Sequence, residues 1–174
     1  MSTTTAGPKI VGPTDGKSVF LGSIGARMMT WTEETEDRFS LVEHPMPPRR
    51  LAAPVHKHSR EDEYSYVLEG RMGALLGDEV VYAEAGDYVY KPRNQWHTFW
   101  NAGDEPCRIL EIIAPGGFEH YFDALGDLIS RPEPDLDAMM ELNERYGIEM
   151  RPETVPELCE KYGLTHPMLE AMVA

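Results

Sequence analysis

The chain has 174 residues, enough for one domain that buries a core, and it carries a formal charge of −14 from 16 basic and 30 acidic side chains. This excess of negative charge opposes binding to the phosphates of nucleic acids and to anionic membrane surfaces, so neither is an expected partner. Cys107 and Cys159 make no disulfide framework. The sequence opens without a signal-peptide pattern and has no long apolar run, which predicts a cytoplasmic protein.

A β domain is expected behind a short extension. Residues 1–17 show no regular pattern and are assigned to an N-terminal extension. From Val19 to Ile113, short β-branched and aromatic segments such as "EYSYVLEG" and "EVVYAEA" are separated by Gly, Pro, Asn and Asp. Many short strands at close spacing predict an all-β sandwich or barrel, which we place at residues 18–115.

The pattern changes to a helical one in residues 116–174. The first helix is indicated by apolar residues at helical spacing: Phe118, Phe122, Leu125 and Ile129. Further helices are predicted over Asp135–Tyr146 and Val155–Tyr162, each followed by a glycine, and a T-x-x-E capping box opens the second of these. We therefore expect a helical C-terminal extension that packs on the barrel.

The stretch "PVHKHSREDEYSYVLEG", residues 54–70, holds the first candidate ligands. In a strand, residues i and i+2 point to the same face, so His56 and His58 can aim at one point while Lys57 points away. Two imidazoles that reach one ion at about 2.0 to 2.1 Å begin a metal site. Two histidines at this spacing also occur as surface decoration, and the acids after them also fit a charged turn.

A carboxylate and a third imidazole favour the metal reading. Glu61 and Asp62 are placed in the turn, whereas Glu63 opens the next strand and is held by a sheet. His97 opens another strand after a turn that contains Pro and Asn. Three imidazoles and one carboxylate suit a divalent first-row ion and leave coordination positions for water or substrate.

Strand alternation also assigns the neighbours of these residues. Four further side chains are expected to face the interior beside the candidate ligands: Ser65, Val67, Phe99 and Asn101. The remaining histidines are expected in solvated or capping roles: His44, His120 and His166.

The spacing of these residues resembles the cupin superfamily. The first cupin motif is matched by His56-x-His58, four residues, Glu63, six residues and Gly70. The second is matched by Gly86, five residues, Pro92, then His97, three residues and Asn101. The chain departs from the second motif at Asn94, where a glycine is usual; Asn tolerates a left-handed backbone, so the turn is still expected.

The resemblance implies a fold and a site. The fold would be a double-stranded β-helix, a jelly-roll-like barrel of two antiparallel sheets, with the C-terminal α-helical extension outside it. The implied metal ligands meet inside the barrel: His56, His58, Glu63 and His97.

The segment "APGGFEHYFDALG" is similar to the Gly-Gly-x-Phe helix of quercetin dioxygenase-like cupins with one cupin domain. This resemblance implies a homodimer and a metal-dependent dioxygenase that acts on a flavonol-like or other enolisable small molecule, with Glu63 as a catalytic base. A non-redox isomerase, cyclase or decarboxylase, or a binding protein without turnover, remains open because one fold hosts many chemistries. The metal is also open among Fe, Mn, Ni, Co and Zn.

Overall fold

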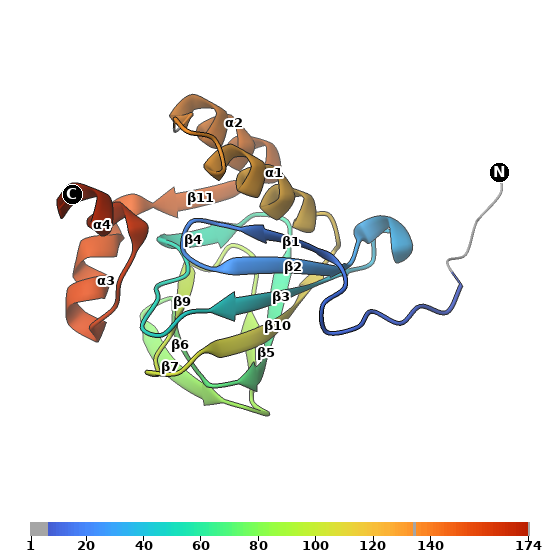
Figure 1. The fold of residues 1–174 in the computed structure, drawn as a ribbon, viewed down its shortest axis with the longest axis horizontal. Helices are drawn as coiled ribbons and strands as arrows, with labels where there is room; N and C mark the ends of the chain where they lie inside the picture. The colour runs from blue at the N-terminus through green and yellow to red at the C-terminus, as the bar shows by residue number, and fades with distance from the viewer. Residues whose placement is uncertain (1–6, 134, 174) are drawn as a thin grey trace.

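The computed structural model describes residues 7–133 and 135–173, so residues 1–6 of the predicted extension lie outside the described part (Figure 1). The strands are β1 (Lys17–Phe20), β2 (Gly25–Thr30), β3 (Ser40–Met46), β4 (Val55–His58), β5 (Asp62–Glu69), β6 (Arg71–Leu76), β7 (Glu79–Glu84), β8 (Tyr88–Lys91), β9 (His97–Asn101), β10 (Cys107–Ala114) and β11 (Ile148–Arg151). The α-helices are α1 (Glu119–Ile129), α2 (Leu136–Tyr146), α3 (Val155–Tyr162) and α4 (Pro167–Val173).

The strands form two antiparallel sheets. One has the order β1-β2-β3-β10-β5-β8 and the other the order β11-β4-β9-β6-β7. From β3 to β10 the chain crosses from one sheet to the other at every connection except that between β6 and β7. This crossing between facing sheets gives the double-stranded β-helix, and it confirms the predicted fold class.

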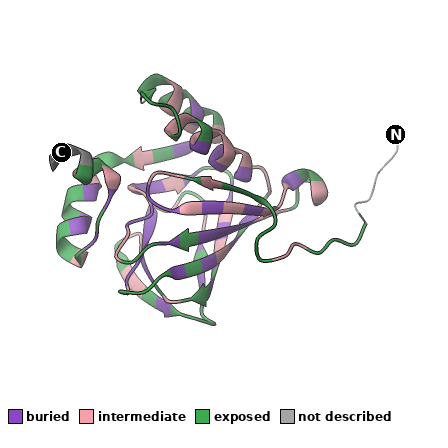
Figure 2. Cartoon of the chain, viewed as in Figure 1, coloured by how far each residue is buried: buried purple, intermediate pink, exposed green. Residues whose placement is uncertain are grey.

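The core lies between the two sheets. Along β10, buried residues alternate with exposed or half-buried ones, whereas β9 is buried at every residue (Figure 2). One cluster of buried side chains fills the barrel near β6 and β7: it includes Met46, Val67, Met72, Ala74, Phe99 and Ile109. A second cluster joins the sheet to α1: it includes Met28, Val42, Ile113, Phe118 and Phe122. The first turn of α1 is therefore part of the barrel's core.

The C-terminal extension covers the barrel with helices and adds a strand to it. In Figure 1, α1 and α2 lie over one end of the barrel, α3 and α4 lie at its side, and β11 runs between the two pairs. β11 pairs antiparallel with β4, in the register Ile148 to His58 and Met150 to His56. No pattern in the sequence predicts this strand. Among the described residues, no helix is both long enough and apolar enough to cross a membrane.

The predicted helices of the extension are present, and two end as expected. Gly147 and Gly163 adopt φ of 66° and 64°, the left-handed conformation typical of a helix C-cap. The expected capping box is wrong, because Thr154 makes no side-chain capping bond. Its hydroxyl accepts a hydrogen bond from the N–H of Val55 (3.1 Å) instead, and so holds the first residue of β4.

Candidate metal centre

Three histidines come together inside the barrel, from two adjacent strands. β4 supplies His56 and His58, and β9 supplies His97, which lies directly opposite His56 in the pairing of the two strands. All three are buried. The ring centroids are 4.5 Å apart for His56 and His97 and 5.4 Å apart for His58 and His97. One nitrogen of each ring lies within 4.8 Å of the others, which is close enough for one ion to contact all three.

Lys57 lies between two of these histidines and points the other way, as strand parity predicts. Its Nζ forms an ion pair with Glu149 of β11 (3.0 Å) and lies 4.8 Å from the ring centroid of Trp96. The outer face of β4 is therefore occupied by contacts to the extension, and only the inner face is available for ligands.

Glu63 reaches the same point from the opposite sheet. It lies on β5, is 4% exposed, and its side chain points inward as predicted. Its Oε1 is 3.4 Å from His58 Nε2, and its Oε2 is 3.3 Å from His97 Nε2. The structure thus brings together all four residues that the sequence analysis singled out.

Hydrogen bonds orient two of the imidazoles toward the centre of the cluster. The Nδ1–H groups of His56 and His97 donate to the carbonyl oxygens of Pro54 (2.8 Å) and Gln95 (2.9 Å). Each bond leaves Nε2 without a proton, as a metal ligand needs. Among the described residues, Nε2 of His58 and Nε2 of His97 have no hydrogen-bond partner although both are buried. Buried nitrogens without partners are rare, and a cation between them would satisfy both, so the residues fit a metal ion.

The electrostatics of the cluster also fit a cation. Burial lowers the pKa of His58 to about 4 and holds the pKa of His56 well below its ordinary value, so both rings are neutral near pH 7. Burial alone would raise the pKa of Glu63. The Lys91 ammonium and the nearby imidazoles outweigh it and hold this pKa well below the ordinary value. His56 and His58 therefore offer neutral imidazoles and Glu63 an ionised carboxylate, the protonation states that bind metals.

Lys91 is a part of the interior that the sequence analysis missed. Its Nζ forms an ion pair with Glu63 Oε2 (2.8 Å) and donates a hydrogen bond to Glu111 Oε2 (3.1 Å). Burial disfavours the charged form, but Glu111 and Glu63 raise the pKa of Lys91 above its ordinary value. A signal was present in the sequence: in the strand "YVYK", Lys91 shares the parity of the buried Val89.

The charged turn after β4 is shorter than expected. Asp62 is the first residue of β5 and points outward, where its carboxylate accepts a hydrogen bond from the guanidinium of Arg93 (2.8 Å). Glu61 is 6% exposed, and its Oε2 lies 3.9 Å from His58 Nδ1. Burial raises the pKa of Glu61 to about 7. Glu61 thus lies in the turn between β4 and β5, as predicted, but its carboxylate is buried behind one candidate ligand.

His44 corrects another expectation. It lies on β3 and is 2% exposed, so it is not solvated. Its Nδ1–H donates to the carbonyl of Gly25 (2.9 Å), and its ring lies edge-on to Phe122. His166 is also buried, but its Nδ1 accepts a hydrogen bond from the N–H of Met168 (3.2 Å) in the first turn of α4, which is the capping role expected of it. The partly exposed His120 contacts Glu33.

The four side chains expected beside the ligands are all buried. Two of them are committed to structural contacts. Ser65 donates to Glu111, and the amide of Asn101 donates to backbone carbonyls, including that of Glu105 (2.8 Å). Val67 and Phe99 belong to the apolar core.

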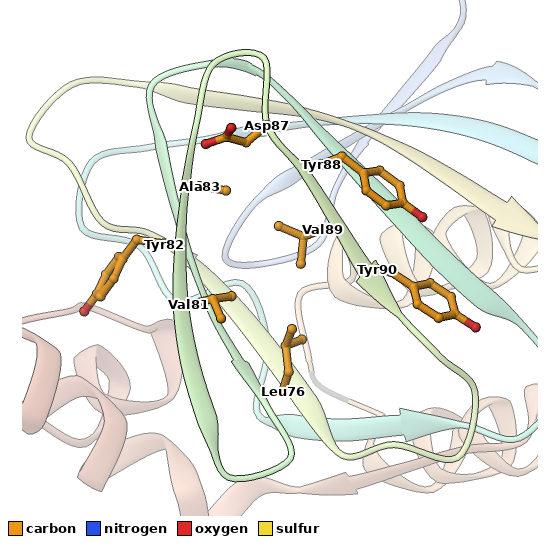
Figure 3. Close-up of a pocket in the computed structure, with 8 residues that line it drawn as sticks. All are labelled: Leu76, Val81, Tyr82, Ala83, Asp87, Tyr88, Val89 and Tyr90. Carbon is orange, nitrogen blue, oxygen red and sulfur yellow. The ribbon is translucent and has the colours of Figure 1, made fainter.

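A pocket of about 430 Å³ opens between β7 and β8, where the edges of the two sheets face each other (Figure 3). Apolar side chains lie between the strands, and three tyrosines stand around them: the lining residues are Leu76, Val81, Tyr82, Ala83, Asp87, Tyr88, Val89 and Tyr90. Leu76 is the cross-strand partner of His97, and Val89 shares a face of β8 with Lys91. The pocket therefore lies beside strands that reach the buried cluster, but none of the four clustered side chains lines it.

Three comparisons agree on the fold. The sequence profile of the cupin domain matches residues 43–113. The chain is 25% identical over 120 residues to quercetin 2,3-dioxygenase of Bacillus subtilis. The aligned residues make up 69% of this chain and 35% of that protein. The structure of the polyketide cyclase RemF from Streptomyces resistomycificus has a TM-score of 0.54 and 32% identity, with 62% of this chain and 79% of that chain covered.

A more distant structure, a predicted oxalate decarboxylase from Thermotoga maritima, shares the fold alone: its TM-score is 0.57 at 18% identity, with 62% of this chain and 99% of that chain covered. The matched part of this chain spans 35 to 45% of the length of the curated relatives it resembles. The residues that match the cupin profile include the barrel strands that carry the four clustered side chains. The chain belongs to the cupin superfamily.

Proposed function

We propose that the protein is a metal-dependent dioxygenase that acts on a flavonol-like or other enolisable small organic molecule. The observation that carries the proposal is the convergence of His56, His58, His97 and Glu63 at one buried point. Among the described residues, Nε2 of His58 and Nε2 of His97 lack hydrogen-bond partners there. The similarity to quercetin 2,3-dioxygenase supports the oxygen chemistry.

The ligand roles follow from the contacts. The Nε2 atoms of the three histidines and a carboxylate oxygen of Glu63 would hold one divalent ion of Fe, Mn, Ni, Co or Zn. When bound, such an ion acts as a Lewis acid that lowers the pKa of a substrate hydroxyl and aligns it for reaction. The backbone carbonyls of Pro54 and Gln95 fix the rings of His56 and His97 in the required orientation.

Glu63 has a second role in this proposal. Its carboxylate is ionised and buried, and it lies where a substrate hydroxyl would approach the ion, so it can accept the hydroxyl proton. Its low pKa makes it a weak base. The transfer therefore depends on a substrate hydroxyl that is made acidic at the same site.

The interior suits an apolar substrate. Leu76, Val81 and Val89 give the pocket between β7 and β8 apolar walls. Pockets for small organic molecules are typically apolar with a few polar groups that fix orientation. A flat, partly aromatic molecule with one enolisable oxygen matches this combination.

A second candidate is a non-redox cyclase. The 32% identity to the polyketide cyclase RemF favours it, and the same buried ion could polarise a carbonyl without oxygen. Both candidates need the metal and Glu63, so they are separated by whether oxygen is consumed.

Oxygen uptake by metal-quantified protein tests the choice. Protein loaded separately with each of the five metals is incubated with a panel of flavonols and 1,3-diketones, beside Glu63→Gln. His120→Ala removes a histidine outside the barrel and serves as the matched control. Uptake that requires the metal, is lost in Glu63→Gln and persists in His120→Ala supports the dioxygenase. A loaded protein that consumes no oxygen with any compound, but converts a polyketide-type substrate, supports the cyclase.

The homodimer and the cytoplasmic location stay predictions. Sedimentation analysis of the purified protein checks the first.

A further inference from the structure

Lys91 places a positive charge in the closed interior of the barrel. Its side chain is 1% exposed, and its Nζ lies 4.5 Å from the ring centroid of Phe99. A buried ammonium is unfavourable unless it is paired, and here two carboxylates pair with it. Glu63 Oε2 lies at 2.8 Å and Glu111 Oε2 at 3.1 Å. One partner belongs to the candidate metal centre and the other does not.

Glu111 is fixed on the side away from the histidines. It lies on β10 opposite Ser65 of β5, whose hydroxyl donates to both carboxylate oxygens at 2.9 and 3.2 Å. Because Ser65 holds it, Glu111 offers Lys91 a fixed second carboxylate in addition to Glu63. The order of contacts across the barrel is therefore Ser65, Glu111, Lys91 and Glu63.

The two oxygens of Glu63 have different surroundings. Each oxygen lies near one imidazole, Oε1 at 3.4 Å from His58 Nε2 and Oε2 at 3.3 Å from His97 Nε2, but only Oε2 also contacts Lys91. An ion among the imidazoles and the ammonium of Lys91 would attract the same carboxylate from opposite sides. Two apolar side chains in place of Lys91 and Glu111 could fill the same interior space without competing for Glu63. Packing therefore does not explain why these two positions carry charged side chains.

We propose that Lys91 is a positioning residue that holds Oε2 of Glu63 and leaves Oε1 for the metal ion, and that Glu111 sets the strength of this hold. The inference rests on the proposed metal function. Lys91 weakens metal binding, because its charge repels the ion and competes for the carboxylate. Glu111 strengthens metal binding, because it takes up part of the charge of Lys91.

Two variants separate this role from a structural one. In Glu111→Gln, Lys91 loses a charged partner and turns fully to Glu63, so the affinity for metal falls about tenfold, within the range typical of residues behind metal ligands. The double variant Lys91→Met, Glu111→Gln removes both charges together and leaves no unpaired ammonium. Its affinity rises to at least about tenfold above that of Glu111→Gln. A structural role would weaken binding in both variants, and most in the double one.

The experiment measures the dissociation constant of Co²⁺ by chelator competition, together with its visible absorption and the melting temperature of each variant. Glu63 freed from Lys91 can bind Co²⁺ through both oxygens. The higher coordination number lowers the intensity of the visible bands in the double variant relative to Glu111→Gln. Arg93→Met is the matched control, because Arg93 is a cation near Glu63 that pairs with Asp62 outside the barrel. Its Co²⁺ affinity and spectrum stay unchanged.

A double variant that binds Co²⁺ no more tightly than Glu111→Gln overturns the inference and leaves the metal site intact. An unchanged spectrum with tighter binding overturns the assignment of Oε1 as the free oxygen. A wild-type protein that binds no Co²⁺ overturns the proposed function and this inference together.

Discussion

His56 and His97 are direct cross-strand partners, with ring centroids 4.5 Å apart. Within the described residues, β4 and β9 pair through these two histidines, so few backbone contacts hold β4 on the side that faces β9. On its other side β4 pairs along its whole length with β11. The strand that supplies two candidate ligands is therefore held in place largely by the C-terminal extension.

Disruption of β11 is expected to weaken metal binding. The N–H of Ser59 donates to the carbonyl of Gly147 (3.0 Å), and the alternation of an antiparallel ladder then makes Lys57 and Glu149 a hydrogen-bonded pair. Glu149→Pro removes the N–H of this pair and costs about 1 to 3 kcal/mol of stability. We expect it to lower the affinity for metal about tenfold, as measured by chelator competition.

The control for this variant is Glu149→Gln, which removes the exposed ion pair with Lys57 but keeps the backbone N–H. It should bind metal like the wild type, since exposed ion pairs contribute little. Equal affinities for the proline and glutamine variants would show that β11 does not support the site.

The three imidazoles are expected to be needed together. His56→Ala and His97→Ala each remove one ligand and leave the remaining donors around a wider gap, so purified protein should retain little metal after dialysis. Measured metal content per chain checks this expectation, with His166→Gln as the control that retains the wild-type content, because His166 lies outside both groups of possible ligands among the described residues. Wild-type metal content in the combined His56→Ala, His97→Ala variant would refute the ligand assignment.

Phe118 closes the site from α1. Its ring lies edge-on to His58 with centroids 4.3 Å apart, and the side chain is fully buried. Phe118→Ala should cost about 3 to 5 kcal/mol of stability and open a path for water to the cluster. A chelator in excess should then strip the metal faster than from the wild type. Phe118→Leu keeps most of the volume, and its stripping rate should lie near that of the wild type; a rate as fast as that of the alanine variant would mean that Phe118 does not limit access.

Local periodicity explains why the candidate ligands could be predicted from the sequence. Alternation along a strand is a property of the backbone, so the inward direction of His58 and Glu63 follows once the strands are identified. The turn before His97 could also be predicted from local sequence. Asn94 adopts φ of 63°, the left-handed conformation that the turn requires and that Asn tolerates.

The features that were missed depend on distant parts of the chain. β11 is four residues long, and its pairing with β4 connects segments about ninety residues apart, which no local pattern reveals. Lys91 and Glu111 occupy inward positions against the general preference of charged residues for the surface, and each is stabilised by the other. The buried ion pairs therefore become visible only when β5, β8 and β10 are placed side by side.

His44 precedes a proline, which favours a solvated or capping role, but this expectation is wrong. β3 continues through Pro45, which lies beyond Glu43, the last residue of β3 that pairs with β2. At that point β3 has a neighbour on one side only, and a residue without an N–H is tolerated there.

The burial of His44 predicts a pH dependence of stability. Burial lowers its pKa from 6.5 to about 4, so in the folded protein it stays neutral while in the unfolded chain it takes up a proton below pH 6.5. Its contribution to stability is complete above pH 6.5 and is lost as the pH falls toward 4, which amounts to up to about 3 kcal/mol. His44→Gln can keep a hydrogen bond to the carbonyl of Gly25 but does not titrate. Chemical unfolding of metal-free protein between pH 7 and pH 4 should therefore show a smaller loss of unfolding free energy in the variant.

The comparison of wild type and variant isolates His44. The other buried groups, including His58 and Glu111, titrate in both proteins, so their contributions cancel in the difference between the two unfolding curves. Parallel curves for wild type and variant would mean that His44 becomes protonated in the folded barrel.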